Sequence, residues 1–537
     1  MHSPSYRHRL LVWALLSLTF MGALVAACHP ARVRAETPTS RPEGRVFYVA
    51  PTGNDANPGT ATAPWRTIQH AAETVGPGDT VYVRAGIYNE AVYVRVSGAG
   101  PDQYITFRNY PGETPVLDGR GLTDPDGVNA FYIEDQSYLI IRGFEIRNYT
   151  TAVPNQVPIA IQITGTSHHI QLLENHIHHI ATRAPVDADL LGADAHGIAV
   201  YGTASSPIHN VLIENNHLHD LTLGSSEALV LNGNVRAFTV TLNLIHDVDN
   251  IAIDAIGFEG TAPQPDVDRA REGLIAGNTI YNVDSRTNPA YGGERSAGGI
   301  YVDGGAHIII EGNTVFSANI GIELASEHPG RETSDILVRN NMLYHNHMTG
   351  IALGGYDSER GSTRNVILVN NTLFHNDTDH TGSGEMLLQY DVQNTMVKNN
   401  ILYANEQGIL ISNPFLENRN NVVDYNLYFA DDSPARWQWR KRWFLGFDAY
   451  RTGTGNDTHG LFADPRFVAP TRADLHILSD SPAVDRGDPT APSGNVDIDG
   501  HPRVVGSGVD IGADEVQSPA RVYLPLAWIK HESSASQ

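Results

Sequence analysis

The sequence predicts an all-β protein: a single-stranded right-handed parallel β-helix (a solenoid) with an N-terminal helix/strand cap and a C-terminal closing module. Three observations support this prediction. A segment with an apolar strand, an Asn and an aliphatic–aromatic or aliphatic–His pair recurs about every 31 residues between residues 140 and 431. Short alternating strands bounded by Gly lie between these segments, with no helical period. The charged fraction is 18%, which is too low for coiled coils or long solvated helices.

The first 27 residues have the features of an export signal. Arg7 and Arg9 precede an apolar run from residue 10 to residue 25, which is short for a membrane span, and small residues then lead to Cys28. This end resembles the lipobox of bacterial lipoproteins, in which the matching Cys, here Cys28, is lipidated. Residues 28–44 are rich in Pro, Thr and Ser, and we interpret them as a lipidated tether.

We therefore expect an exported protein that is lipid-anchored at the bacterial cell surface and touches the membrane only through the lipid on Cys28. The alternative is an ordinary signal peptide and a secreted protein. Cys28 is the only Cys of the chain, which excludes an internal disulfide. The formal net charge of −24 repels phosphate, so nucleic acid is not an expected partner.

Residues 45–125 are expected to form the N-terminal cap and the first coils. Within residues 46–88, an amphipathic helix fits Trp65 to Val75, and a strand over Thr80–Val83 begins the coils. This stretch resembles the N-terminal module of the pectate-lyase superfamily, notably the family-nine polysaccharide lyases. The resemblance implies an extracellular protein that acts on or contacts glycans.

Residues 126–430 are predicted to form the coils of the β-helix. The repeated Asn is expected to form a ladder at one turn of each coil, with Gly143 at the same position in the first repeat. The ladder residues are Asn175, Asn216, Asn243, Asn278, Asn313, Asn341, Asn371, Asn400 and Asn426.

A second strand series carries the candidate catalytic residues. Aligning its inward residues (Ile198, Leu229, Ile253, Ile300, Ile322, Ile351 and Ile409) predicts that the next residue of each strand points outward. Asp254, Asp303 and Glu323 then fall on consecutive coils of one face, with neighbouring carboxylates roughly 8 Å apart for coils spaced at about 4.8 Å. Such a spacing suits an inverting glycosidase, and clustering raises one carboxyl pKa toward neutrality.

Polar residues of the flanking strands and loops are candidates for substrate binding, the alternative being that they are simply solvated. They are His196, Tyr201, Glu227, Asn232, Glu259, Glu294, Arg295, Tyr301, Glu327 and Asp357.

Residues 431–515 are expected to form a C-terminal closing module, followed by a tail over residues 516–537. Residues 461–468 and 474–515 resemble the closing module often found in bacterial surface β-helix proteins. The aromatic and basic segment 436–450 is expected to pack on the protein surface. The acids of the module are expected to cap turns, with a structural Ca²⁺ as the alternative. They are Asp485, Asp488, Asp497, Asp499, Asp510, Asp514 and Glu515.

Three functions fit these patterns. In each of them we expect the protein to be a monomer and its partner to be an extracellular polysaccharide. The favoured one is glycoside hydrolysis by paired carboxylates, which requires no cofactor. The second is a pectate-type lyase that uses Ca²⁺ and a base other than Lys, namely Arg295, Tyr301 or His196, because Lys398 is the only lysine among the coils. The family-nine lyases use a Lys beside an acidic calcium motif, and neither feature carries over. The third is a surface adhesin that binds glycan without catalysis.

Overall fold

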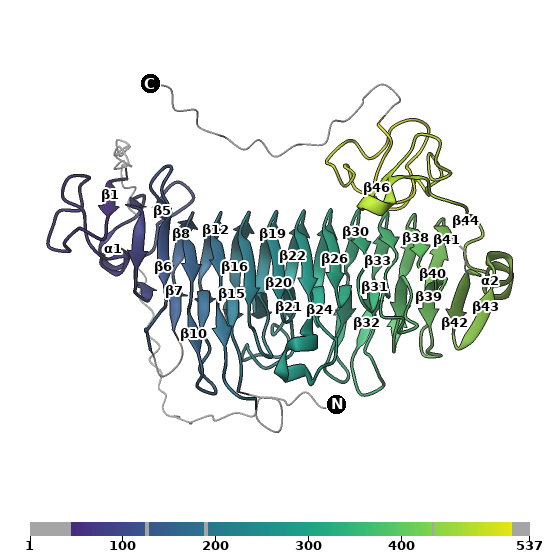
Figure 1. Cartoon of the computed structure of the whole chain (residues 1–537), viewed down its shortest axis with the longest axis horizontal. Coiled ribbons are helices and arrows are strands. Elements are labelled where there is room, and N and C mark those ends of the chain that lie inside the picture. The colour runs from purple at the N-terminus through teal and green to yellow at the C-terminus, as the bar shows by residue number, and fades with distance from the viewer. Residues whose placement is uncertain (1–43, 124–127, 187–191, 432–433, 518–537) are drawn as a thin grey trace, which may run out of the picture.

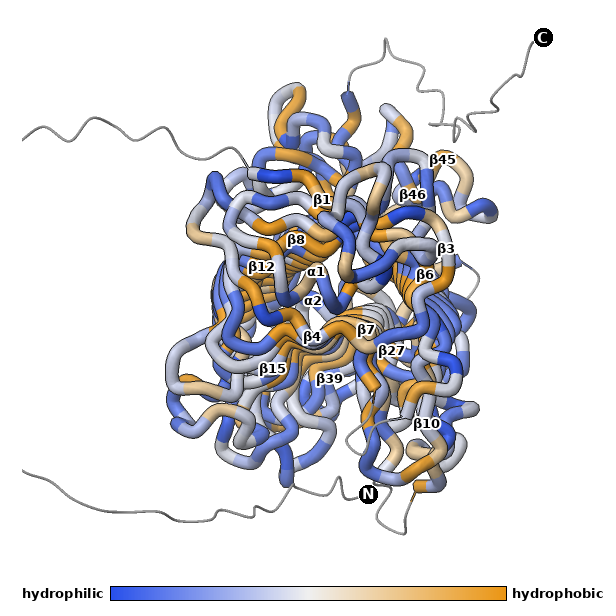
Figure 2. The backbone as a smooth tube through the Cα atoms, turned by 90° about the vertical axis from the view of Figure 1, so that its left-hand side faces the viewer, coloured by the Kyte–Doolittle hydropathy of each residue, from blue (hydrophilic) through white to orange (hydrophobic). Residues whose placement is uncertain are grey.

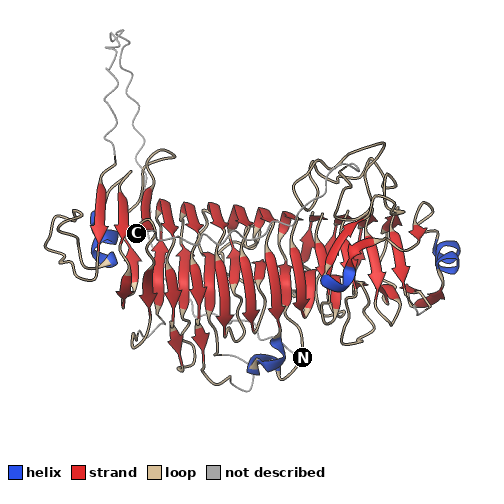
Figure 3. Ribbon diagram, turned by 45° about the horizontal axis from the view of Figure 1, so that its top comes forward, coloured by secondary structure: helices blue, strands red, loops and turns tan. Residues whose placement is uncertain are grey.

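The computed structural model describes residues 44–123, 128–186, 192–431 and 434–517. The signal segment, Cys28 and the tether as far as residue 43 lie outside the described residues, as does the tail from residue 518. The described chain winds through three long parallel sheets, in the order sheet 1, sheet 2, sheet 3 in each coil (Figures 1 and 3). The predicted parallel β-helix is confirmed. No helix of the described residues is long and apolar enough to cross a membrane.

Sheet 1 runs the length of the solenoid. Its strands are β1 (Val46–Val49), β2 (Thr80–Val83), β5 (Ile105–Asn109), β8 (Ser137–Arg142), β12 (His168–Leu173), β16 (Ile208–Glu214), β19 (Val235–Thr241), β22 (Arg271–Ala276), β25 (Ala306–Glu311), β29 (Leu337–Arg339), β33 (Ile367–Val369), β37 (Met396–Lys398) and β40 (Val422–Asp424), with β28 (Glu332–Ser334), β32 (Ser362–Arg364) and β36 (Val392–Gln393) paired beside them.

Sheet 2 follows sheet 1 across a tight turn. Its strands are β3 (Gly86–Tyr88), β6 (Pro115–Asp118), β9 (Glu145–Arg147), β13 (His176–His178), β17 (His217–Leu221), β20 (Leu244–Val248), β23 (Thr279–Val283), β26 (Thr314–Ala318), β30 (Met342–Tyr344), β34 (Thr372–Phe374), β38 (Ile401–Ala404), β41 (Leu427–Ala430) and β44 (Leu461–Phe462).

Sheet 3 closes each coil and carries the predicted catalytic face. Its strands are β4 (Val92–Val94), β7 (Asn129–Glu134), β11 (Ile159–Thr164), β15 (His196–Gly202), β18 (Leu229–Gly233), β21 (Ile253–Ile256), β24 (Gly298–Asp303), β27 (Ile320–Ala325), β31 (Thr349–Leu353), β35 (Met386–Leu388), β39 (Ile409–Asn413), β42 (Arg436–Trp439) and β43 (Arg442–Leu445). A short pair, β10 (Thr150–Thr151) and β14 (Ala181–Thr182), lies outside the three sheets.

The core lies inside the three sheets, where aliphatic side chains of successive coils stack on one another. The backbone viewed along the solenoid shows hydrophobic residues recurring along the strands of each sheet (Figure 2). In sheet 2, for example, Ile177, Leu218, Ile245 and Ile280 occupy paired positions and are all fully buried. Each coil therefore covers the apolar faces of its neighbours, as in other solenoids.

The turn between sheets 1 and 2 carries the predicted ladder of Asn side chains. The Oδ1 atom of Asn278 accepts hydrogen bonds from the backbone N–H and the Nδ2 of Asn243, both at 3.0 Å, and the Nδ2 of Asn278 donates to Oδ1 of Asn313 at 2.9 Å. The pattern repeats from Asn175 to Asn426. It ends on Asp457, whose Oδ1 accepts from the backbone N–H and the Nδ2 of Asn426. The ladder is thus confirmed, and a carboxylate ends it.

The predicted place of Gly143 in this ladder is wrong by one residue. Strand pairing sets Glu145 beside His176, so Phe144 occupies the ladder position, and its N–H donates to Oδ1 of Asn175 at 3.2 Å. Gly143 instead holds the preceding corner with φ of 75°. Glu174 holds the same corner in the next coil with φ of 55°. Gly supplies this left-handed conformation without steric cost, which explains its presence there.

The N-terminal end is closed by α1 (Ile68–Thr74), which is shorter than the helix predicted from the sequence. Thr67 caps it by accepting a hydrogen bond from the N–H of His70 at 3.1 Å. Ile68, Ala71 and Ala72 are fully buried, so the helix covers the open end of the first coil with its apolar face. The strand Thr80–Val83 is found as predicted, paired with β1.

The C-terminal end is closed by the hairpin β42–β43 and by α2 (Phe447–Thr454). Trp437 is fully buried and stacks on Tyr450 with ring centroids 5.0 Å apart. The aromatic and basic segment 436–450 is therefore packed, as expected.

The rest of the closing module, residues 461–517, lies along the flank of the coils (Figure 1). It contains β45 (Phe467–Ala469), β46 (Asp474–Ile477) and the short helix η3 (Pro470–Arg472). Three Asn side chains of consecutive turns hold it: Asn340 donates to Ser493 and Val496, Asn370 to Asp510 and Gly512, and Asn399 to Asp488.

Most acids of the module accept hydrogen bonds from backbone N–H groups. Asp485 accepts from Ser507 and Gly508, and Asp497 accepts from Asp499 and His501. This is the turn capping that the sequence analysis favoured. Asp499 differs, because its carboxylate contacts His476 at 3.1 Å.

Candidate active site

Strand pairing in sheet 3 aligns the central residues of the predicted catalytic face. Asp254 of β21 lies beside Tyr301 of β24, which lies beside Glu323 of β27. Asp303 follows Tyr301 by two residues on β24, so both side chains point to the same face. The order of these residues across three coils is therefore the one predicted from the repeat.

The alignment fails further along the sheet. Ile351 pairs with Met386, which pairs with Ile411 and not with Ile409. The pairing of β39 with β42 is irregular between Ile409 and Ile411, which is consistent with a local shift of the strand. The shift changes none of the predicted catalytic positions.

The outer face of sheet 3 is covered rather than open. Asp254 is 2% exposed and Asp303 is 5% exposed. Further back along the face, Ala199, Val230 and Ile256 form a small buried apolar cluster. Loops that join sheet 3 to its neighbours supply the cover, so two of the three predicted carboxylates lie within the protein.

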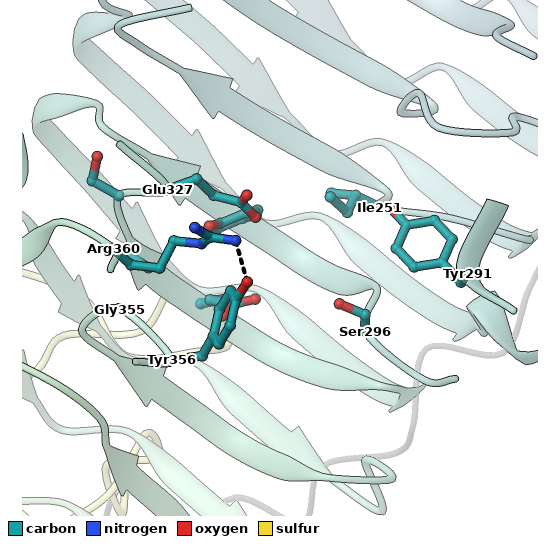
Figure 4. A pocket seen from close by; sticks show the side chains of 11 residues that line it. Ile251, Tyr291, Ser296, Glu327, Gly355, Tyr356 and Arg360 are labelled. Atoms are coloured by element: carbon teal, nitrogen blue, oxygen red, sulfur yellow. Dashed lines mark hydrogen bonds between the residues drawn. The ribbon is translucent and has the colours of Figure 1, made fainter. Parts of the chain in front are cut away.

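A cavity of about 100 Å³ opens beside these carboxylates, and Glu323 and Glu327 are its acids (Figure 4). Asp254 and Asp303 do not line it. Its other lining residues come from sheet 3 and from the loops on both sides: Ile251, Tyr291, Ser296, Tyr301, Ala325, Ser326, Gly355, Tyr356 and Arg360. Tyr291 ends the short helix η2 (Pro289–Tyr291), which follows η1 (Ser285–Thr287) in the loop between sheets 2 and 3.

Burial raises the carboxyl pKa values at this site. The pKa of Glu323 rises to about 8, chiefly through burial and then through repulsion by Glu327. Burial also raises the pKa of Glu327, although the positive charge of Arg360 opposes this rise. The pKa of Asp254 lies well above its ordinary value because of burial and of the nearby Glu227 and other acids. Glu323 therefore keeps its proton near neutral pH.

Asp303 contacts the segment that carries Glu327. Its Oδ1 accepts a hydrogen bond from the backbone N–H of Glu327 at 2.8 Å. Burial, followed by the charge of Glu327, raises the pKa of Asp303 well above its usual value. Asp303 thus positions a residue of the cavity while lying outside it.

Arg360 and Tyr356 line the cavity on the same side as Glu327, across from Ile251 and Tyr291 (Figure 4). The guanidinium donates a hydrogen bond to the Tyr356 hydroxyl and lies 4.6 Å from the centroid of its ring (Figure 4). In the same view the guanidinium points toward Glu327. A cation beside one carboxylate and a protonated second carboxyl is an arrangement suited to acid–base chemistry.

His196 and Tyr201 form a pair on the preceding coils. His196 is 2% exposed, and its Nδ1 lies 3.0 Å from the backbone oxygen of Glu227. A carbonyl only accepts, so Nδ1 carries the hydrogen, and Nε2 accepts from the Tyr201 hydroxyl at 2.9 Å. Burial lowers the pKa of His196 to about 4, so the ring is neutral.

The structure also places Asn232 and Glu259 together. Nδ2 of Asn232 lies 3.1 Å from Oε2 of Glu259, and its Oδ1 accepts from Thr261 at 2.7 Å. Glu259 belongs to the loop after β21, and Asn232 is 4% exposed. Neither residue lines the cavity.

Three further predicted substrate-binding residues also lie outside the cavity lining. Arg295 forms ion pairs with Asp284 and Asp379, which hold its side chain. Glu294 is exposed, and neither residue is among the lining. Asp357 caps its own turn by accepting from the N–H of Glu359 at 2.8 Å.

Sequence reasoning missed Arg360, but it does place a Gly-rich loop that begins at Tyr291 beside this face, and it offers Tyr356 as a ring that could stack on a sugar. All three belong to loops, whose path is set by contacts and not by the coil repeat. One signal was available for Arg360: it lies in a loop bounded by Gly355 and Gly361, one coil beyond Glu323.

Two of the three bases proposed for a lyase are poorly suited in this structure. Arg295 is held by two carboxylates, and burial raises the pKa of Tyr301 well above its usual value. Lys398 lies in sheet 1, and its Nζ contacts Asp488 at 2.7 Å. Among the described coils it therefore serves to hold the closing module.

A mixed group of donors lies next to the cavity. One ligand atom each from Glu259, Asp303 and His328 lies within 4.8 Å of the others. The Nε2 of His328 is buried without a hydrogen-bond partner. Calcium takes oxygen ligands, six to eight of them, so an imidazole with two carboxylates does not fit the ion that a pectate-type lyase needs.

Comparison with known proteins agrees with this architecture. A family model described as the Pel9A-like right-handed β-helix region matches residues 47–184, and one described as the right-handed β-helix region matches residues 159–378 and 266–430. The chain belongs to the family of right-handed β-helix proteins. Its fold is related to that of polysaccharide-acting enzymes.

Proteins similar to the chain include two curated relatives and a solved structure. The uncharacterized protein YwoF of Bacillus subtilis is 41% identical over 442 residues, which is 82% of this chain and 92% of YwoF. The pectate lyase PEL9 of Emericella nidulans is 36% identical over 78 residues, 14% of this chain and 19% of PEL9. A structure of XylC in complex with xylose has a TM-score of 0.50 and 12% identity, covering 87% of this chain and 98% of that one.

Proposed function

We propose that the protein is a glycoside hydrolase that acts on an extracellular polysaccharide. The observation that carries this proposal is the pair of carboxyl groups in one cavity, with the pKa of Glu323 raised to about 8 and Glu327 beside Arg360. Glycoside hydrolysis needs one protonated and one ionised carboxyl group on the two sides of the scissile bond.

The roles follow from these environments. Glu323 donates its proton to the glycosidic oxygen as the bond to the anomeric carbon breaks. Glu327 acts as the carboxylate that supports attack by water at that carbon, and the positive charge of Arg360 favours its ionised form. Tyr291, Tyr301 and Tyr356 supply rings and hydroxyl groups for a sugar.

This assignment modifies the acid–base set predicted from the sequence. Glu323 keeps its role, and Glu327 replaces Asp254 and Asp303 as its partner. Asp303 supports the segment of Glu327 by accepting a hydrogen bond from its backbone N–H, and it is a positioning residue in this proposal. Asp254 is buried beside Tyr301 and is given no catalytic role.

The test is incubation with a panel of neutral and acidic polysaccharides, with and without Ca²⁺, while new reducing ends and near-ultraviolet absorbance are recorded together. Hydrolysis gives reducing ends without absorbance and without a need for Ca²⁺. Glu323→Gln and Glu327→Gln are expected to lower kcat by at least about 100-fold. Glu272→Gln, an exposed change on sheet 1, serves as the matched control and should retain activity.

An unsaturated product that absorbs in the near ultraviolet and disappears with a chelator would instead identify a lyase. The pectate lyase likeness of the N-terminal region favours this second candidate. Binding to glycan with no product after long incubation would identify the adhesin. Full activity of Glu323→Gln on the true substrate would contradict the catalytic assignment.

We also propose that the protein is exported and attached to the cell surface by a lipid on Cys28. The proposal rests on the apolar segment that precedes this lone Cys. Labelled fatty acid should enter the wild-type chain and not Cys28→Ser, and the variant should be found in the medium. Equal labelling of both chains would exclude the anchor.

A further inference from the structure

The outer face of sheet 2 carries a grid of histidines, separate from the acidic cavity on sheet 3. His176 and His178 lie on β13, His217 and His219 on β17, and His246 on β20. Strand pairing places His176 beside His217 and His178 beside His219. His219 in turn lies beside His246 of the following coil. Residues two apart on a strand share a face, so five imidazoles meet on three consecutive coils.

The ring nitrogens of this grid point toward one another. Nε2 of His176 lies 2.7 Å from Nε2 of His219, and Nε2 of His217 lies 2.7 Å from Nε2 of His246. One nitrogen each from His176, His217 and His219 lies within 4.8 Å of the others.

Carboxylates fix the orientation of two of these rings. Nδ1 of His219 lies 2.7 Å from Oδ2 of Asp220, and Nδ1 of His246 lies 2.6 Å from Oδ2 of Asp247. An ionised carboxylate only accepts hydrogen bonds, so each Nδ1 carries a hydrogen, and each Nε2 of a neutral ring presents a lone pair to the grid. Metal-binding histidines are commonly held by a carboxylate in this way.

Ring stacking alone does not explain the grid. The column of His219 and His246 continues as Tyr281, Phe316 and Tyr344, whose rings stack at centroid distances of 4.6 to 4.9 Å. Tyr and Phe thus satisfy the packing in later coils. The imidazoles and their carboxylates are confined to the coils where the nitrogens converge.

We propose that His176, His217 and His219 form a binding site for a late first-row transition ion, for which Zn²⁺ is the probe. Imidazole nitrogen suits Zn²⁺, Cu²⁺ and Ni²⁺, whereas Ca²⁺ and Mg²⁺ prefer oxygen. In a tetrahedral zinc site with Zn–N bonds near 2.0–2.1 Å, ligand nitrogens lie about 3.3 Å apart. The three nitrogens already lie within 4.8 Å of one another, which is close to that spacing.

His176 comes from β13, and His217 and His219 come from β17. The ion would tie β13 to β17 from outside and leave one coordination position open.

Calorimetric titration of the chelator-treated full chain with Zn²⁺ tests the proposal, and the visible spectrum of the Co²⁺ form reports the geometry. We expect one ion per chain and a tetrahedral cobalt spectrum. His219→Tyr keeps the stacking seen in later coils and should lower the affinity at least about tenfold. Asp220→Asn, which leaves all three ligands in place, should lower it by about 10- to 100-fold.

His209→Gln is the matched control, because His209 belongs to a different stacked pair, with His168 on sheet 1. It should bind Zn²⁺ as the wild type does. The proposal is overturned if the wild type takes up no ion at micromolar Zn²⁺, or if His219→Tyr and His209→Gln bind it equally. Circular dichroism of each metal-free variant confirms that a lost affinity does not reflect unfolding.

Discussion

Replacing Asn278 with Ala removes one rung from the middle of the ladder. The side chain is 1% exposed and makes four hydrogen bonds, to the backbone N–H and Nδ2 of Asn243, to the backbone oxygen of Val240 and to Oδ1 of Asn313. At about 1 kcal/mol net for each buried bond, the four contribute about 4 kcal/mol. Some of the partners keep a second bond, so we expect a loss of about 2–4 kcal/mol.

Hydrogen exchange followed by mass spectrometry is the suitable assay, because long repeat arrays need not unfold in one step. Amides of β20 and β23 should exchange about 30- to 1000-fold faster, since about 1.4 kcal/mol corresponds to a factor of ten. Asn282→Gly is the control: Asn282 has φ of 52° and makes one exposed hydrogen bond, to Asp247. A change of less than tenfold for Asn278→Ala would refute the assigned role of the ladder.

Three further predictions concern other parts of the molecule. Asp457→Asn should destabilise the C-terminal coil, because the Asp457 carboxylate accepts hydrogen bonds from Asn426 and from the hydroxyl of Tyr428, and the amide would turn an N–H donor toward one of them. Faster hydrogen exchange at β41 would report this change. The pKa of Glu323 is raised from 4.5 to about 8, so between these two pH values the folded chain holds a proton that the unfolded chain has lost, and the free energy of unfolding falls as pH rises. Glu323→Gln should flatten the curve of unfolding free energy against pH, and an unchanged slope would exclude the raised pKa. Gly273→Ala should destabilise sheet 1, because the new Cβ would lie 2.1 Å from the ring of Phe238. Thermal melting should show that adding Phe238→Leu restores part of the lost stability.

The repeat predicted the fold because each coil obeys the same physical rule. An aliphatic residue must point inward at a fixed place, and an amide must satisfy the backbone at a fixed turn. Asp254, Tyr301 and Glu323 could be aligned by that rule alone, since strand pairing conserves the register. The error at Gly143 arose because the corner residue and the ladder residue are adjacent. In this coil the ladder position is occupied by Phe144, whereas later coils have Asn there.

The cavity could be predicted only in part, because loops form most of it. Glu327 and Arg360 follow strands of sheet 3 by loops of different length, and no periodicity relates them. Arg295 shows the opposite error: it lies next to Ser296 of the cavity, yet Asp284 and Asp379 hold its side chain elsewhere. Ion pairs between segments distant in the sequence cannot be recognised from a local sequence pattern.

The ladder has a direction, and this sets where the protein can be lengthened. Every rung donates toward the next coil and accepts from the one before, so an added coil with its own Asn would fit between any two rungs before Asp457. The closing module restricts that freedom, because Asn340, Asn370 and Asn399 hold it at a fixed spacing of one coil. Gene duplication or design could therefore extend the solenoid on the N-terminal side of Asn340. The number of coils under the module must stay at three, because the module contacts one Asn of each.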